Sequence, residues 1–102
     1  MVITIFRSRL RPGHEAAYHA TAVRMRQLAE QVPGFVAIKT FQADDGERVS
    51  IVEFASEESH RAWREHPEHR AAQERGRAEF YSEYRIQVCA LERQYQFPPP
   101  RA

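Results

Sequence analysis

The sequence contains no asparagine and only one cysteine, Cys89. A single cysteine cannot close an intramolecular disulfide, and no cysteine pair exists that could anchor zinc. No apolar run reaches transmembrane length, and no basic segment with an apolar core follows Met1, so we expect a soluble, cytoplasmic protein without a membrane partner. A glycine-rich dinucleotide fingerprint and a Walker loop are also missing, so a flavin or nicotinamide would need another binding mode.

The chain has little net charge, +1 over 102 residues, which gives no overall electrostatic argument for nucleic-acid binding. Its length favours one domain, and a domain of this size often relies on a partner to cover part of its apolar surface. The apolar runs are largely aliphatic and lack the mixture of aromatic and basic residues that RNA-binding sheets present. We therefore expect no nucleic-acid partner.

Residue periodicity predicts the order β-α-β-β-α-β. Alternation of β-branched and aromatic residues predicts strands, spacings of three and four predict helices, and Asp45-Gly46 is typical of a tight hairpin turn. Three prolines make the C-terminal segment unsuitable for a sheet. The predicted strands are residues 2–10, 35–42, 48–54 and 84–95; the first helix runs from residue 14 or 15 to Pro33-Gly34, the second helical stretch begins at residue 57, and residues 96–102 form a proline-rich tail.

The second helical stretch is predicted to break at Pro67. Ser56 is suited to cap its start, because a serine hydroxyl accepts from free backbone N–H groups. A residue before proline leaves the helical region, whereas proline fits the first position of a new helix. His66 is therefore expected to cap a second segment, with His69 in its first turn and Gly76 as a mild interruption farther on.

This order predicts an α+β, ferredoxin-like fold, with a four-stranded antiparallel sheet and the helices on one face. Alternation places apolar residues on both faces of the sheet: Val2, Phe6 and Leu10 oppose Ile3 and Ile5; Phe35, Ala37 and Phe41 oppose Val36 and Ile38; Val49 and Ile51 oppose Val52 and Phe54. Helices can cover only one of these faces. We therefore predict a homodimer in which two sheets pack face to face, and expect Cys89, in the middle of a strand, to be buried.

Several segments resemble the antibiotic biosynthesis monooxygenase family, whose members are dimeric α+β barrels. They are R-P-G-H at residues 11–14, V-P-G-F at 32–35, V-S-I-V-E-F-A-S at 49–56, W-R-E-H-P-E-H-R at 63–70 and F-Y-S-E-Y-R-I-Q-V at 80–88. The resemblance covers residues 1–95, which we predict to be the family domain. It implies a substrate site between sheet and helices, and Trp63 matches the family's tryptophan. Haem-degrading members use an Asn–Trp–His set, which a chain without asparagine lacks.

Three residues are candidate catalytic groups: His66, His69 and Trp63. A histidine in a first helical turn is favoured in its neutral form and could accept a phenolic proton, while an indole could stack on an aromatic ring. The alternatives are that His66 only caps a helix, His69 lies at the surface and Trp63 anchors the core. The histidines straddle the break at Pro67, so we predict no metal site.

Further residues are candidates for substrate binding: Arg7, Ser8, His60, Arg77 and Tyr81. By alternation only one of Arg7 and Ser8 faces the site, and the sequence does not say which. An arginine or a tyrosine hydroxyl could hold a phenolate. The resemblance then implies a cofactor-independent monooxygenase acting on an aromatic phenol or quinol. A non-enzymatic small-molecule or haem-binding module and a structural domain without ligand are the alternatives.

Overall fold

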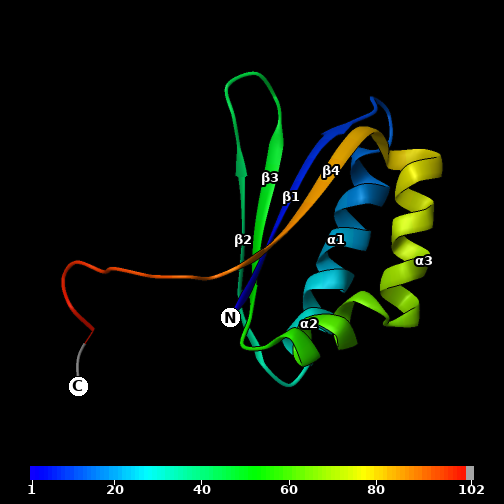
Figure 1. Cartoon of the computed structure of the whole chain (residues 1–102). Helices are drawn as coiled ribbons and strands as arrows, with labels where there is room; N and C mark the ends of the chain where they lie inside the picture. Colours follow the sequence, from blue (N-terminus) through cyan, green and yellow to red (C-terminus); the bar gives the residue numbers. More distant parts are fainter. Residues whose placement is uncertain (101–102) are drawn as a thin grey trace.

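The computed structural model describes residues 1–100, and it contains the predicted elements in the predicted order (Figure 1). Residues 101–102 of the predicted tail lie outside the described residues. The strands are β1 (Val2–Leu10), β2 (Phe35–Gln42), β3 (Arg48–Phe54) and β4 (Tyr81–Ala90); the helices are α1 (Glu15–Glu30), α2 (Glu57–Arg64) and α3 (Pro67–Arg75), followed by a π-helical turn, η1 (Gly76–Phe80). The fold is therefore ferredoxin-like α+β, as predicted.

The four strands form one antiparallel sheet in the order β2-β3-β1-β4. The predicted bounds of β1, β2 and β3 are confirmed, whereas those of β4 are wrong at both ends. β4 starts earlier because η1 returns the chain to the sheet, so that Tyr81 pairs with Leu10. It ends earlier because Ala90 lies opposite Val2, where β1 begins and no further partner residue is available.

Local capping explains the corner between α2 and α3. The Ser56 hydroxyl accepts from the Ser59 N–H and the Ser59 hydroxyl accepts from the Ser56 N–H, both at 3.1 Å, which is a capping box. Pro67 is the first residue of α3, and the His66 ring accepts from the Glu68 N–H. The predicted helix break at proline is confirmed.

The core lies between the sheet and the helices, which all cover one face of the sheet (Figure 1). Its buried residues are Leu28, Ala29, Val52, Phe54 and Trp63. One predicted orientation is wrong: a register shift in β2 between Phe35 and Ala37 separates these residues onto opposite faces. Phe35 packs against Phe54 in the core, with ring centroids 5.9 Å apart.

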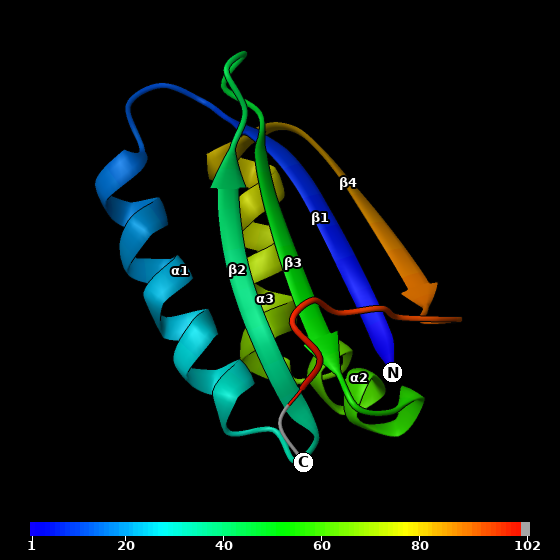
Figure 2. The same ribbon diagram turned by 90° about the vertical axis from the view of Figure 1, so that its left-hand side faces the viewer.

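No helix covers the other face of the sheet, and only the C-terminal segment crosses it (Figure 2). The uncovered strand positions include Ile3, Ile5, Val49, Ile51 and Phe41, which we call the open face. Cys89 pairs with Ile3 there and is exposed rather than buried, because nothing packs on this side of the sheet. Within residues 1–100, no helix combines the length and apolarity needed to cross a membrane.

Candidate functional site

The corner between α2 and α3 brings His69 onto Trp63. The two rings are stacked, with 4.1 Å between their centroids and 22° between their planes. His69 Nδ1 lies 3.2 Å from the backbone carbonyl oxygen of Trp63. A carbonyl oxygen can only accept, so Nδ1 must carry the hydrogen and donate it. In the neutral ring this leaves Nε2 unprotonated and able to accept a hydrogen bond from a ligand.

The surroundings of His69 hold it in the neutral form. The pKa of His69 is lowered from 6.5 to about 4, chiefly by burial, and the positive charges that His66 and His60 can carry act in the same direction. The carbonyl oxygen of Trp63 acts in the opposite direction, but its effect is smaller than that of burial. At neutral pH His69 is therefore an uncharged hydrogen-bond acceptor, as the sequence interpretation required, but a weak base.

His66 occupies the capping position that the sequence suggested as the alternative to a catalytic role. Its Nδ1 accepts from the Glu68 N–H at 3.1 Å, so the neutral ring carries its hydrogen on Nε2. Its ring centroid lies 6.2 Å from that of Trp63. In this state His66 has no ring nitrogen left to accept a proton from a ligand.

Trp63 is part of the core as well as the stacking partner of His69. Only 9% of its surface is exposed, and it belongs to the same buried cluster as Val52 and Phe54. One side of the indole therefore anchors the core, as the alternative interpretation of the sequence suggested. The other side is covered by the His69 ring, so the tryptophan and the histidine hold each other in place.

Two buried polar atoms beside this core have no hydrogen-bond partner within the described residues. They are Nδ1 of His60 and the side-chain oxygen of Thr4. His60 is 4% exposed and lies edge-on to Phe54, and burial lowers its pKa. Thr4 pairs with Val52, which places it on the helix-facing side of the sheet. Unpaired polar atoms in an interior are uncommon and are candidates for ligand contacts.

The structure separates the two candidates on β1. Ser8 is 3% exposed and lies on the helix-facing side, as do the core residues Val2 and Phe54. Arg7 lies on the opposite side, where its guanidinium donates to both carboxylate oxygens of Glu47 at 2.9 and 3.1 Å. Ser8 is therefore the residue that faces the helices, and Arg7 belongs to the open face.

Tyr81 belongs to an aromatic cluster on the helix-facing side of the sheet, at the end where β1 finishes with Leu10. Its ring centroid lies 5.4 Å from that of Phe6, 5.9 Å from that of Tyr18 and 5.7 Å from that of Tyr84. Burial raises the pKa of the Tyr81 hydroxyl, and the Tyr18 hydroxyl beside it acts in the same direction. Arg77 is exposed and donates to the Tyr84 hydroxyl at 3.1 Å.

Sequence reasoning missed two residues of this cluster, Tyr18 and Arg48. Tyr18 is on the apolar stripe of α1. The guanidinium carbon of Arg48 lies over its ring, 5.4 Å from the ring centroid. Arg48 has the same strand parity as Val52 and Phe54, so alternation alone indicated that it faces the helices. That signal was available in the sequence.

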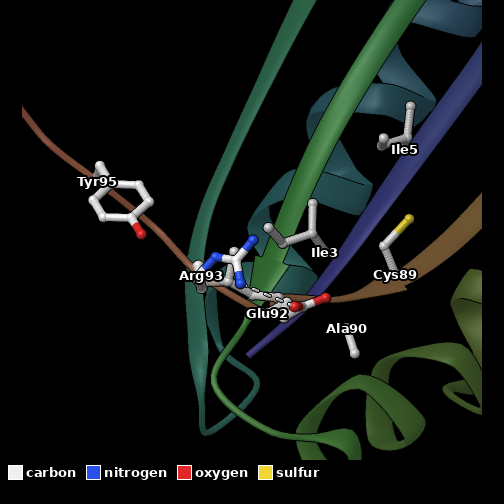
Figure 3. Close-up of a pocket in the computed structure, with 8 residues that line it drawn as sticks. Ile3, Ile5, Cys89, Ala90, Glu92, Arg93 and Tyr95 are labelled. Carbon is white, nitrogen blue, oxygen red and sulfur yellow. Dashed lines mark hydrogen bonds and ion pairs between the residues drawn. The ribbon is translucent and has the colours of Figure 1, made fainter.

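Two hollows of the described structure lie away from Trp63. A hollow of about 440 Å³ lies between the open face and the C-terminal segment, and its lining includes Ile3, Ile5, Cys89 and Tyr95 (Figure 3). A second, of about 290 Å³, lies at the hairpin end of the sheet and includes Ser8 and Tyr84. Within residues 1–100, no three histidine, cysteine, aspartate or glutamate side chains gather as metal ligands would.

The sequence matches a known protein family and a protein of similar sequence. The profile of the antibiotic biosynthesis monooxygenase family matches residues 1–75. The uncharacterised protein YqjZ of Bacillus subtilis (strain 168) is 33% identical over 90 residues, which cover 88% of this chain and 79% of YqjZ.

Solved structures share the fold at lower identity. Rv0793 from Mycobacterium tuberculosis superposes with a TM-score of 0.80 at 19% identity, covering 93% of this chain and 98% of that one. SnoaB, a cofactor-independent oxygenase from Streptomyces nogalater, superposes with a TM-score of 0.76 at 18% identity, covering 96% and 97%. The family profile extends over most of the chain, from β1 through α3, and the YqjZ alignment covers more still. The chain therefore belongs to the antibiotic biosynthesis monooxygenase family.

Proposed function

We propose that this protein is a monooxygenase that oxidises an aromatic phenol or quinol between its sheet and helices without a metal or flavin. The observation that carries the proposal is the neutral His69 ring stacked on Trp63, with Nε2 free to accept. Family membership and the fold shared with SnoaB, a cofactor-independent oxygenase, support the reaction class. Fold similarity alone would not define a reaction, so the argument rests on this pair.

In the proposed mechanism His69 Nε2 accepts a hydrogen bond from the substrate hydroxyl, and Trp63 holds the imidazole in place by stacking on it. Loss of the hydroxyl proton to solvent water gives an electron-rich anion that reacts directly with oxygen. With a pKa of about 4, His69 orients and polarises the hydroxyl more than it retains the proton. For a naphthohydroquinone, one oxygen atom enters the ring and the other leaves as water, while the quinol supplies all four electrons.

The direct test is turnover of 1,4-naphthohydroquinone under ¹⁸O₂, with mass analysis of the hydroxynaphthoquinone formed. We expect protein-dependent incorporation of one labelled oxygen atom and no reaction under nitrogen. Removing the acceptor nitrogen while keeping a stacked ring, His69→Phe, should lower kcat about 100-fold with little change in KM. Product formation that does not require oxygen, or a His69→Phe variant as active as the wild type, would contradict the proposal.

A structural domain without ligand is the competing function, and the helix-capping role of His66 and the core position of Trp63 favour it. His66→Asn tests whether His66 acts only as a helix cap, because asparagine also caps helices but lacks the imidazole. The enzyme proposal expects full activity from His66→Asn. If no quinol or phenol quenches Trp63 fluorescence or is turned over, the structural function is the better one.

We also propose a homodimer formed through the open face. One face of the sheet is covered by helices, and the other presents Ile3, Ile5, Val49, Ile51 and Phe41 without a covering layer (Figure 2). Phe41 alone is 47% exposed. Packing two such faces together would bury the apolar side chains and convert two open sheets into a dimeric α+β barrel. The C-terminal segment that crosses this face would lie at the edge of the interface.

A further inference from the structure

The segment that follows β4 has the residue alternation of a strand but, within residues 1–100, no strand to pair with. Its alternate positions carry a glutamate and two glutamines on one side and, on the other, Leu91, Arg93, Tyr95 and Phe97. This pattern led us to predict a strand as far as Tyr95. In the structure β4 ends at Ala90, and beyond it the Leu91 N–H donates to the carbonyl oxygen of Met1. We call residues 91–100 the C-terminal arm.

The C-terminal arm runs away from the sheet on the side opposite the helices (Figure 1). It does not pack closely on the open face, because the hollow of about 440 Å³ lies between the two. Tyr95 is 88% exposed and Phe97 is 95% exposed. Two neighbouring aromatic side chains in solvent are unfavourable in an isolated subunit, so they indicate a surface that another molecule covers.

A second copy of the chain is the partner that lies in the path of the C-terminal arm. In the proposed homodimer its sheet packs on the open face, and packed sheets lie about 10 Å apart. Residues 91–97 span about 23 Å when they are extended, so the arm can reach past the second sheet. The family profile ends at residue 75 and therefore does not describe this segment.

The edge strand β2 of the second copy is the surface that suits the arm. The strand order β2-β3-β1-β4 leaves β2 and β4 as the edges of each sheet. A two-fold axis that places the end of β4 beside β2 of the other copy makes the same contact twice, so both sheets lose open edges. Val36 and Phe41 are exposed apolar side chains of β2. The Ile38 carbonyl oxygen accepts from the Arg26 side chain at 2.9 Å, so this edge takes donors from outside the sheet.

We infer that the C-terminal arm of each subunit adds as a strand to the β2 edge of the second copy, with Tyr95 and Phe97 as its apolar anchors. The inference rests on the proposed homodimer and deepens it, because the arm adds contacts outside the open face. Main-chain hydrogen bonds hold an added strand in place, and its alternate side chains give specificity. Pro98 lacks an N–H and therefore ends the added strand.

The first test replaces the two anchors and leaves the backbone of the arm unchanged. Tyr95→Ser combined with Phe97→Ser should weaken the dimer roughly tenfold or more, measured as the dissociation constant by sedimentation equilibrium. The matched control is Gln94→Ser combined with Gln96→Ser, which changes the other side of the same arm and should leave the dissociation constant unchanged. A dimer of wild-type affinity after loss of both anchors would overturn the inference, and so would equal weakening by the control.

The second test locates the arm in chains that carry Cys89→Ser. Gln96→Cys chains are mixed with Lys39→Cys chains, whose new thiol lies on β2, and a short bismaleimide then joins thiols that lie close together. We expect the mixed covalent dimer, which intact mass resolves from the two like dimers. Val23→Cys, on α1 and away from the open face, replaces Lys39→Cys in the control and should give no mixed product.

These outcomes separate the arm from the dimer. A dimeric wild type without the product that joins positions 96 and 39 would overturn the inference and leave the homodimer intact. Equal yields with Lys39→Cys and Val23→Cys would also overturn it. A monomeric wild type would contradict both the arm and the homodimer, whereas the proposed oxidation is tested separately by turnover.

Discussion

Gly76 lies so close to the Tyr81 ring that a Cβ atom at Gly76 would be 2.5 Å from Cε2 of the tyrosine. Gly76 opens the π-helical turn that leads from α3 into β4, and it is buried. The missing side chain lets the Tyr81 ring lie against the turn, beside Phe6 and Tyr18. The predicted mild interruption at Gly76 is therefore a packing requirement of the tyrosine cluster.

Gly76→Ala should destabilise the protein by roughly 1–3 kcal/mol, because the new methyl group displaces the Tyr81 ring from a packed cluster. Urea denaturation measures the change. Tyr81→Leu in the same chain should remove most of the additional cost, which a double-mutant cycle reports as coupling between the two positions. Additive effects of the two substitutions would show that the contact does not govern stability.

His69 should make stability depend on pH between about 4 and 6.5. Its pKa is about 4 in the folded protein, and its ordinary value is 6.5, so the unfolded chain binds more protons in this window. The contribution is fully present above pH 6.5 and is lost as the pH falls towards 4, up to roughly 3 kcal/mol. Urea denaturation of the wild type and of His69→Phe at pH 7 and pH 4.5 measures it.

In that experiment His69→Phe should lose less stability on acidification than the wild type. Some dependence should remain, since burial also lowers the pKa of His60. The matched control is His19→Phe, which changes an exposed histidine of α1 and should behave like the wild type. Identical losses in the wild type and His69→Phe would rule out a depressed pKa at His69.

Ser56→Ala should destabilise the protein by about 1 kcal/mol, because it removes the hydroxyl that accepts from the Ser59 N–H at the start of α2. Ser56→Asp keeps an acceptor at the same position and should retain most of the stability. Thermal unfolding at neutral pH compares the three proteins. Equal Tm values for the alanine and aspartate variants would mean that the cap does not hold α2 in place.

Ile51→Lys should convert the proposed dimer into a monomer, because it places a charge in the middle of the open face. Sedimentation velocity at micromolar concentration measures the oligomeric state, and circular dichroism checks that the variant remains folded. Val23→Lys is the control, since Val23 is a 44% exposed hydrophobic residue of α1, away from this face. A monomeric wild type would contradict the dimer.

The sequence alone determined the features that depend on neighbouring residues. Alternation defined β1, β2 and β3, and Pro67 defined the break between α2 and α3, because strand parity and proline geometry act over a few residues. The bounds of β4 were not accessible in this way. They depend on where β1 begins and on how η1 returns the chain, which are properties of the pairing partner.

The candidate site also combines features that the local sequence predicted with features that only the tertiary structure decided. Its residue types, and the capping position of His66, followed from local chemistry. Only the tertiary structure decided that His69 stacks on Trp63, that Ser8 rather than Arg7 faces the helices, and that Arg48 joins Tyr18 and Tyr81. The stack depends on how α2 and α3 meet at the Pro67 corner, and the other two depend on how the helices pack on one particular face of the sheet.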